Sequence, residues 1–464
     1  MSKGGLEICI PRRLRHIMTI PQFYAKVPSV KPEHLQRCQV ATPPDVVDLL
    51  WDLALAERKG ATFPSVLDLG AGDARFARSA KARFDRYEGV EQDHHKITQA
   101  GLPQSAQVVQ GDAMAWRGAK ASLSIGNPPF IKSAHLDPHW RTAVLDRLEH
   151  ESGTRLKDTA NVFVLFMLQA LLRTRDDGLV VQLVPYEWVT RPSAAEFRAY
   201  LHEQRWDVQV YRFDADIFPR VLTTASVVII DKRGTKGRWS FGEIGRNGAM
   251  RTFTSPSGTA KSVLPYADRD GNVHALRGLS PGGQDIFVLT EQQRLHFGLK
   301  KQRDVAPCVT SLRRLAKDTD VLDAETFRRD FVQAGARCWL IRSDKAHWSP
   351  ELSAYLDSVG TRWKRYSTCT NRSQWARYVS HPAPALLVSS GFVGKAPKVV
   401  VNEIGAVAVG SVYAVLTQRS KPKLAKLASR LRAYDFSRRL VHHSNNLRKI
   451  EVRQLNAVLQ RVGD

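Results

Sequence analysis

At positions 121–130 the chain reads ASLSIGNPPF, and this stretch decides the predicted fold. Residues 121–126 form a short apolar run, which predicts a buried strand that ends in a turn. Pro128 and Pro129 cannot donate backbone hydrogen bonds and keep the chain extended, so the strand stops before them. In open α/β sheets, ligands bind at the carboxyl ends of the strands. We therefore expect a binding site at this corner, with an ordinary proline turn as the competing interpretation.

The corner offers groups suited to a flat ring that carries an amino group. The Asn127 side chain can both accept and donate hydrogen bonds, and Pro128 offers a carbonyl without an N–H. Phe130 adds an aromatic face on which a ring can stack. The candidate catalytic residues are Asn127, Pro128, Pro129 and Phe130.

The length and the charge distribution predict more than one domain. A chain of 464 residues exceeds one ordinary domain, so we expect two or three. Of the net charge of +24, residues 1–234 contribute +4 and residues 235–464 contribute +20. A near-neutral first half joined to a strongly basic second half indicates a polyanionic partner for the second half.

Cysteine usage and hydropathy predict a cytoplasmic protein. The five cysteines are scattered without a Cys-x-x-Cys pair, which argues against a zinc site or a disulfide framework and favours a reducing compartment. The amino-terminal residues lack the apolar core of a signal peptide, and no stretch approaches the roughly 20 apolar residues of a membrane span. We therefore expect no metal site and no membrane partner.

The chain opens with a basic, proline-punctuated arm over residues 1–39. After it, Thr42 is a plausible N-cap, followed by two prolines in the first turn and apolar residues at helical spacing up to position 55. This pattern predicts a helix whose amino-terminal amides would favour a carboxylate or a phosphate.

Three further strands are each predicted to end in an acidic or small residue. The first, residues 66–69, contains Asp68 and leads into Gly70-Ala71-Gly72. The third glycine of the dinucleotide pattern is missing and the acid would repel a pyrophosphate, which favours a zwitterionic ligand such as S-adenosylmethionine. The second strand ends in Glu91, which suits a ribose diol. The third is followed by Asp112, which can accept from the amine of an adenine ring.

This order of strand ends resembles the N6-adenine DNA methyltransferases of restriction–modification systems, over roughly residues 40–234. Residues 127–130 match that family's (Asn/Asp)-Pro-Pro-(Tyr/Phe/Trp) motif, and residues 68–74 resemble its glycine-rich loop. Asp73 departs from that pattern by adding a second acid. The resemblance implies that the cofactor is bound by Thr42, Pro43, Asp68, Gly70, Ala71, Gly72, Glu91, Asp112, Ala113 and Asn127.

The resemblance also implies the architecture and the reaction. We expect a Rossmann-like α/β domain dependent on S-adenosylmethionine at residues 40–234 and an α+β target-recognition domain at residues 235–464. The implied activity is transfer of a methyl group to N6 of an adenine flipped out of double-stranded DNA, at a specific site. Phe130 and Phe218 would stack on that base, although a core position for Phe218 is an equal alternative. A cognate restriction endonuclease is a candidate partner.

The second half carries no motif of this kind. Residues 235–285 are rich in Gly, Ser and Pro and predict loops, whereas residues 398–401 and 406–413 predict a pair of strands and residues 421–461 predict basic helices. Arginine, asparagine and glutamine interleaved with aromatic residues suit contacts to phosphates and base edges. The candidate DNA-binding residues are Arg362, Trp363, Lys364, Arg365, Arg372, Gln374 and Arg377.

Other functions remain open on the sequence alone. The same tetrapeptide serves methyltransferases that act on glutamine amides, but those are shorter and lack a large basic domain. Charge does not separate RNA from DNA, so an RNA adenine methyltransferase is an alternative. A DNA-binding subunit with a vestigial cofactor site is another, and the intact acids at the strand ends argue against it.

Overall fold

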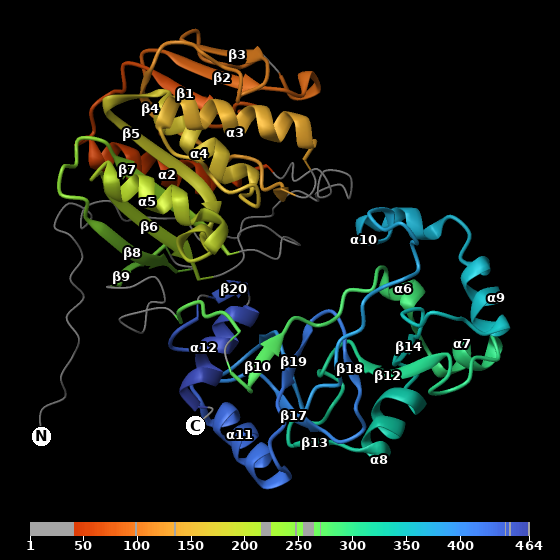
Figure 1. Cartoon of the computed structure of the whole chain (residues 1–464). Coiled ribbons are helices and arrows are strands. Elements are labelled where there is room, and N and C mark those ends of the chain that lie inside the picture. Colours follow the sequence, from red (N-terminus) through yellow and green to blue (C-terminus); the bar gives the residue numbers. More distant parts are fainter. Residues whose placement is uncertain are drawn as a thin grey trace, which may run out of the picture. The chain divides into compact units, whose positions relative to one another are not determined.

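The computed structural model describes residues 41–97, 100–133, 136–214, 224–245, 248–253, 264–269, 271–440, 442–444 and 447–462. The chain divides into two compact units (Figure 1). The first consists of residues up to 263 together with 441–445, and the second consists of residues 264–440 and 446–464.

The first unit is built on a nine-stranded sheet in the order β3-β2-β1-β4-β5-β7-β6-β8-β9. Strands β1 to β5 are parallel, β7 is antiparallel to β5, and β6 is antiparallel to β7. The strands are β1 (Val66–Leu69), β2 (Tyr87–Glu91), β3 (Ala106–Gln110), β4 (Ala121–Gly126), β5 (Thr174–Pro185), β6 (Asp207–Phe213), β7 (Ala225–Asp231), β8 (Trp239–Ile244) and β9 (Met250–Phe253). The prediction of a Rossmann-like α/β fold is confirmed.

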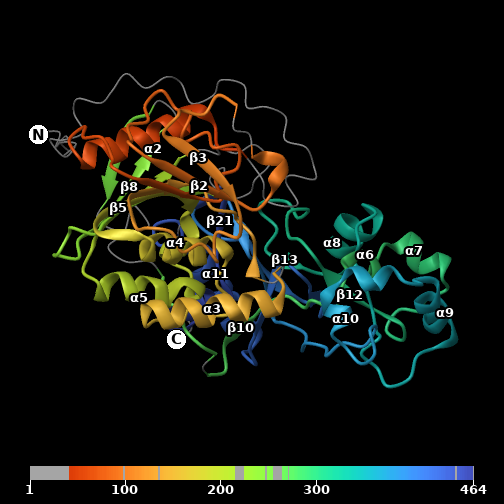
Figure 2. The same cartoon turned by 90° about the horizontal axis from the view of Figure 1, so that it is seen from above.

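Helices cover both faces of this sheet. Figure 2 shows α2 on one face and α3, α4 and α5 on the other. The bounds are α2 (Pro44–Glu57), α3 (Pro138–Ser152), α4 (Val162–Leu172) and α5 (Ala195–Glu203), with 3₁₀ turns at η2 (His94–Lys96), η4 (Tyr186–Val189) and η5 (Pro192–Ala194). Alternate residues of a strand face opposite ways, so Leu67 and Leu69 of β1 join the core under α4, whereas Val66 joins the core under α2.

The second unit is α+β, as predicted. One sheet has the order β10-β19-β15-β17-β13 and another the order β11-β14-β12-β18. The strands are β10 (His274–Leu276), β11 (Val288–Leu289), β12 (Val305–Val309), β13 (Val321–Leu322), β14 (Trp339–Ile341), β15 (Leu386–Ser389), β16 (Gly391–Phe392), β17 (Val399–Asn402), β18 (Val407–Ala408), β19 (Val412–Leu416) and β21 (Leu447–Lys449). The helices are α6 (Gln284–Phe287), α7 (Glu291–His296), α8 (Ala324–Phe327), α9 (Pro350–Ser358), α10 (Ser367–Thr370), α11 (Lys421–Ala433) and α12 (Val452–Val462), with a π-helical turn η6 (Arg328–Gln333) and a 3₁₀ turn η7 (Arg362–Arg365). The segment 441–445, which belongs to the first unit, holds the short strand β20 (His442–Ser444).

The predicted domain boundary after residue 234 is too early. Strands β8 and β9 pair onto β6 and extend the first sheet, so the first unit continues to residue 263. Arg212 on β6 is 5% exposed and donates two hydrogen bonds to Glu243 on β8 at 3.0 and 2.9 Å. A buried arginine requires such a partner. The prediction of loops at 235–285 is wrong at 239–244, 250–253 and 274–276, which are strands, because Gly and Ser lie within β8 as well as between strands.

The predicted strand pair in the second half is also corrected. The segments at 398–401 and 406–413 do not pair with each other, because β17 pairs with β13 and β15, whereas β18 pairs with β12. Even with the later boundary, residues 264–464 carry a net charge of +16, so the second unit remains the basic one. Within the described residues, no helix has the length and apolar character needed to cross a membrane.

The position of β8 predicts where the chain can be cut. A fragment that ends at residue 234 exposes the edge of β6 and leaves Arg212 without its carboxylate, whereas a fragment that ends at residue 263 keeps both. We expect the longer fragment to unfold cooperatively on heating, followed by circular dichroism, and the shorter one to melt at least several degrees lower or to aggregate. Identical melting curves would show that β8 and β9 contribute nothing to this sheet.

Candidate active site

The candidate site lies where the strand order reverses between β1 and β4. These strands are parallel neighbours, so the loop after β1 and the tetrapeptide after β4 emerge at the same edge of the sheet. A side-chain carbon at Gly126 would lie 2.4 Å from Oδ1 of Asp68, and one at Gly70 would lie 3.6 Å from Cδ of Pro129. Only glycine permits the first approach, so the Asp68 carboxyl lies against the backbone that leads into the tetrapeptide. Such a reversal is where ligands bind in open α/β sheets.

Asn127 is held by one end of its amide. Its Nδ2 donates to the hydroxyl oxygen of Thr42 at 3.0 Å, and Thr42 is only 3% exposed. The amide oxygen, Oδ1, is buried and accepts no hydrogen bond from the described residues. A buried amide oxygen without a donor costs free energy. The site therefore contains an acceptor that is fixed in direction and ready for a donor from outside the described chain.

Thr42 was predicted to cap α2 with its side chain, and that prediction is wrong. Pro43 occupies the cap position and no side chain caps the helix, although the Pro43 carbonyl accepts from the amides of Val46 and Val47 at 3.1 and 3.0 Å. The Thr42 hydroxyl instead serves Asn127. Pro44 at the first helical position agrees with the prediction.

Phe130 is half-buried beside the start of α4. Its ring meets the ring of Phe163 edge to face, with centroids 6.1 Å apart and planes at 70°. The amide of Val162 donates to the Ile131 carbonyl at 3.0 Å, which ties the segment after the tetrapeptide to the same helix. Phe130 is thereby held in a defined orientation. Phe218, the second predicted stacking residue, lies outside the described residues.

Glu91 fixes the glycine-rich loop through backbone amides. Its carboxylate accepts from Gly72 N at 2.8 Å and from Asp93 N at 2.9 Å. The amides of Gly70 and Ala71 donate to the Val90 carbonyl at 2.8 and 3.0 Å. Gly72 has φ of +58° and space around its Cα. The loop is thus held against the end of β2, with lone pairs of Glu91 still available to a hydroxyl.

Asp68 is more deeply buried than a surface ligand would be. It is 1% exposed and accepts from the Tyr87 hydroxyl at 2.6 Å, while Oδ1 has no partner among the described residues. Burial raises the pKa of Asp68 to about 7, the Tyr87 hydrogen bond opposes this rise, and the nearby carboxylates of Glu91 and Asp73 add to it.

Asp112 is already engaged on both oxygens. One accepts from Met114 N at 2.8 Å and the other from the indole N–H of Trp140 on α3 at 3.0 Å. Ala113 is 6% exposed, and its carbonyl accepts from the buried side chain of Gln169 at 3.1 Å. Nothing in the sequence around Trp140 pointed to this contact, because it joins segments 28 residues apart.

Asp73 and Arg75 were missed as members of the site. The two side chains form an ion pair, and Arg75 also donates from Nη1 to the Thr42 carbonyl. Partial burial raises the pKa of Asp73, but the hydrogen bond and charge of Arg75 hold it below its ordinary value overall. Asp73, the additional acid in the glycine loop, is therefore paired with Arg75, which also contacts Thr42, the residue that holds Asn127.

The predicted DNA-binding residues lie in the second unit, and they divide into two kinds. Arg372 donates to the Pro281 carbonyl at 2.5 Å, and Arg377 donates to Gln374 at 2.8 Å and to the Ala346 carbonyl at 3.2 Å, so these two arginines brace loops. Trp363 stacks on Trp375 with centroids 5.6 Å apart.

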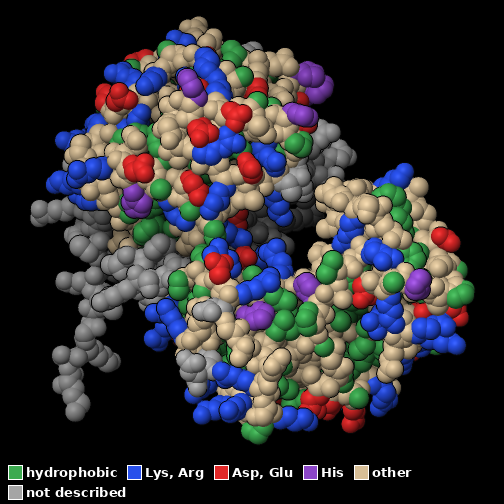
Figure 3. All heavy atoms as spheres, viewed as in Figure 1, with side chains coloured by type: hydrophobic (Ala, Val, Ile, Leu, Met, Phe, Trp, Pro, Cys, Tyr) green, Lys and Arg blue, Asp and Glu red, His purple; other side chains and the backbone are tan. Residues whose placement is uncertain are grey.

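The turn η7 presents the remaining cations. Lys364 and Arg365 are exposed, and Arg362 is exposed with one bond to the Val359 carbonyl. Figure 3 shows Lys and Arg side chains at several places on the visible face of the second unit. Across the described residues, no group of His, Cys, Asp and Glu has the arrangement of a metal site.

Comparison with known proteins agrees with this architecture. Residues 117–218 match the model of the Eco57I restriction-modification methylase, and residues 274–433 match the C-terminal domain of the type II methyltransferase M.Eco57I. A relative named type II methyltransferase M.TthHB8I, from Thermus thermophilus, is 28% identical over 205 residues. That match covers 43% of this chain and 46% of the relative, so the chain spans about half the length of the curated relative it matches.

Several solved structures are similar in fold to part or most of this chain. The methyltransferase subunit of a type I restriction-modification system from Streptococcus thermophilus covers 44% of this chain and 47% of its own, at 18% identity and a TM-score of 0.37. The type IIG restriction endonuclease BpuSI covers 91% of this chain and 59% of its own, at 12% identity and a TM-score of 0.41. A nuclease-deletion mutant of the type ISP enzyme LlaGI covers 91% and 46%, at 12% identity and a TM-score of 0.49.

The sheet order and the site at its reversal define a protein with a Rossmann-like methyltransferase fold. Within that class, the chain has the methylase domain and the C-terminal domain of the Eco57I type of restriction-modification methylase.

The buried Asp68 carboxyl predicts a pH dependence of stability. Its pKa of about 7 in the fold exceeds its ordinary value of 3.8, so between these values the unfolded chain has released a proton that the folded chain still holds. Stability contributed by this group therefore falls as the pH rises from about 4 to about 7. Asp68→Asn keeps an acceptor for Tyr87 without the charge. As the pH rises from 5 to 8, the melting temperature of Asp68→Asn should increase by several degrees relative to that of wild type.

The control for that measurement is Asp73→Asn, which removes a half-exposed carboxylate from the same loop. Because its pKa is lowered in the fold, it should show no gain in relative stability at pH 8. A difference between wild type and Asp68→Asn that stays constant across this pH range argues against a carboxyl that titrates inside the fold.

Proposed function

We propose that this chain is a site-specific DNA methyltransferase that transfers a methyl group from S-adenosylmethionine to N6 of adenine. The observation that carries the proposal is the Asn127 amide, whose nitrogen is held by Thr42 and whose oxygen is buried without a partner among the described residues. An exocyclic amine supplies the donor that this oxygen lacks. The match to restriction-modification methylases supports DNA as the substrate and a restriction or related defence system as the setting.

The chemistry follows from two acceptors and a stacking face. The lone pair of an adenine amine is delocalised into the ring, which makes the nitrogen a poor nucleophile. Asn127 Oδ1 and the Pro128 carbonyl would each accept one N6–H, which draws the nitrogen toward tetrahedral geometry and stabilises positive charge as it develops on that nitrogen. The new N–C bond would form as the methyl–sulfur bond breaks, with a neutral thioether as the leaving group, and the methylated nitrogen would then lose its extra proton to water. Both acceptors are fixed before the reaction, so little reorganisation is needed. Phe130 would hold the plane of the base.

The same edge of the sheet fits S-adenosylmethionine. When bound, this cofactor supplies the methyl group from a sulfonium centre. Glu91 would bind the ribose hydroxyls and Asp112 the adenine, and the backbone of Gly70–Gly72 would lie along the cofactor, with Thr42-Pro43 and Ala113 beside it. In its ionised form, Asp68 would contribute negative charge beside the backbone of Gly126. Its unpartnered oxygen and the space beside Gly72 support this fit.

The target atom is inaccessible inside a duplex, so we propose that the adenine flips out of the stack, at a cost of a few kcal/mol. The basic second unit, with a net charge of +16, would bind the duplex. A cognate restriction endonuclease is the proposed partner.

Substitution of Asn127 tests the catalytic assignment. Asn127→Ala removes the unpartnered acceptor, and loss of one preorganised partner of this kind costs about 10²–10³ in turnover. We expect turnover to fall by this factor while the affinities for DNA and cofactor stay near those of wild type. Turnover is measured as transfer of labelled methyl groups to DNA and to RNA of the same sequence. Asn127→Asp keeps an acceptor and should retain part of the activity. Turnover of Asn127→Ala near that of wild type would falsify the proposed centre, and methylation of RNA alone would replace the substrate.

The face of Phe130 is tested in the same assay. Phe130→Trp keeps a stacking surface and should retain part of the activity, whereas Phe130→Ala should lose most of it. A DNA duplex with 2-aminopurine at the target reports unstacking as a rise in fluorescence. Asn127→Ala should still give that rise and Phe130→Ala should alter it. Equal activity of the Trp and Ala variants would remove Phe130 from the site.

The charge of η7 makes a separate prediction about DNA affinity. Lys364→Gln with Arg365→Gln should weaken binding and reduce the slope of log K against log salt by about 2, because each phosphate contact contributes roughly 0.9. The matched control is Lys423→Gln with Lys426→Gln, which removes the same charge from exposed positions of α11. Equal effects of the two pairs would assign DNA affinity to overall charge and not to this turn.

A further inference from the structure

A chain of contacts joins the glycine-rich loop to Asn127 through Thr42. We propose that Asp73 and Arg75 are a positioning pair that holds Thr42 and, through Thr42, keeps the Asn127 amide oxygen turned toward the substrate. The part of this inference that concerns the substrate rests on the function proposed above for Asn127. The part that concerns the geometry of the amide stands on the contacts alone.

The Arg75 guanidinium is fixed before it reaches Thr42. Its Nε donates to one oxygen of Asp73 at 2.9 Å and its Nη2 donates to the other, which is the bidentate geometry that suits a planar guanidinium. The third nitrogen, Nη1, is then directed at the Thr42 carbonyl. Gly72 and Ala74 have φ of +58° and +54°, so left-handed residues flank Asp73. Asp73, the unexplained second acid, thus sets the direction of Arg75.

Thr42 depends on outside partners because it lies just before α2. The first hydrogen bonds of that helix start from the Pro43 carbonyl, so among the described residues no bond within the helix reaches Thr42. The contacts described for Thr42 are its carbonyl, which accepts from Arg75, and its hydroxyl, which accepts from Asn127. A carbonyl that is released from Arg75 lets the hydroxyl move, and the Asn127 amide moves with it.

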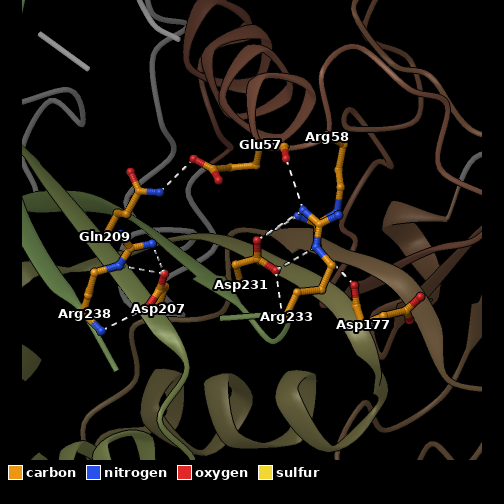
Figure 4. Close-up of polar contacts among 8 residues, drawn as sticks. All are labelled: Glu57, Arg58, Asp177, Asp207, Gln209, Asp231, Arg233 and Arg238. Atoms are coloured by element: carbon orange, nitrogen blue, oxygen red, sulfur yellow. Dashed lines mark hydrogen bonds and ion pairs between the residues drawn. The ribbon is translucent and has the colours of Figure 1, made fainter. Parts of the chain in front are cut away.

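The rest of α2 is anchored independently of Arg75. Figure 4 shows Arg58 at the far end of the helix between Asp231 and Asp177. Arg58 donates to both Asp231 oxygens at 3.0 and 3.1 Å and to the Asp177 carbonyl at 3.2 Å. Beside it, Gln209 donates to Glu57 at 2.7 Å. Loss of Arg75 should therefore free only the first turn of α2 and leave the domain folded.

The magnitudes separate a positioning role from a stabilising one. The side chains of Arg75 and Asp73 are 27% and 51% exposed, and ion pairs that are open to water contribute little to stability. Activity is more sensitive, because a catalytic acceptor that is misdirected by a fraction of an ångström no longer matches the transition state. We expect Arg75→Gln to lower kcat by about 10-fold, less than removal of Asn127 itself, with KM and the melting temperature close to wild type.

The control variant is Arg83→Gln. Arg83 is exposed, and its guanidinium donates to the carbonyl oxygens of Ala80 at 3.0 Å and Ala82 at 2.8 Å, which do not belong to the positioning pair or to Thr42. The substitution removes the same charge close to the glycine-rich loop and should leave kcat near wild type. Arg75→Lys, which can still donate to a carbonyl, should recover part of the activity lost in Arg75→Gln.

A double-mutant cycle tests whether Arg75 acts through Thr42. Thr42→Val removes the hydroxyl that accepts from Asn127, so in this background Arg75→Gln should lower kcat little further. Independent, multiplicative losses would overturn the relay, because residues that act through one shared contact are non-additive.

A second measurement does not require activity. With asparagine selectively labelled with ¹⁵N, the side-chain amide signal of Asn127 can be assigned by its loss in Asn127→Ala. Arg75→Gln should shift or broaden this signal, and Arg83→Gln should not. Equal spectra for the two arginine variants would overturn the positioning role. If wild type methylates neither DNA nor RNA, the proposed function fails, and the spectra still decide whether Arg75 positions the amide.

Discussion

The site depends on the parallel pairing of β1 with β4. Because these strands are neighbours and the connections run to opposite sides of them, two loops from distant parts of the sequence emerge at one edge. The absence of a side chain at Gly126 lets the Asp68 carboxyl lie 2.4 Å from where a Cβ would be. A larger residue there would push the tetrapeptide away from the glycine loop. The close contact between the Asp68 carboxyl and the Gly126 backbone therefore sets the distance between the glycine-rich loop and the tetrapeptide of the proposed site.

The strand ends were predictable from the sequence because each depends on local signals. Apolar runs end in glycine or proline, and β3 and β4 have the predicted bounds. Thr42 does not cap α2, although a residue before two prolines looks like a cap, and its hydroxyl accepts from Asn127 instead. Its bond to Asn127 spans 85 positions, and no local pattern contains it. Arg75 escaped notice for the same reason.

Strands and their pairing were less predictable in the second half of the chain, because residues typical of loops also occur within its strands. Gly242 lies inside β8, although glycine usually marks a loop, and a side-chain carbon there would lie 2.6 Å from Tyr211 on the neighbouring strand. Arg372 and Arg377 were predicted from the sequence as DNA contacts, and the structure adds that they donate to backbone carbonyls and to a glutamine of their own unit. Net charge predicts that a unit attracts a polyanion. The hydrogen-bond partners of each arginine depend instead on which backbone carbonyls the fold places near it.

The unpaired oxygen of Asn127 and the unpaired oxygen of Asp68 have a common cause. Both are buried at the reversal between β1 and β4, where no backbone amide of the described chain turns toward them. A fold that only needed to be stable would place apolar atoms there, because buried acceptors without donors lower stability. Their position at the edge where ligands bind is the physical basis for the proposal that they face substrate and cofactor. The same reasoning applies to Asp73 and Arg75. Their ion pair is partly exposed and adds little stability, but through Thr42 it fixes the direction of the Asn127 amide oxygen, whose donor comes from the substrate.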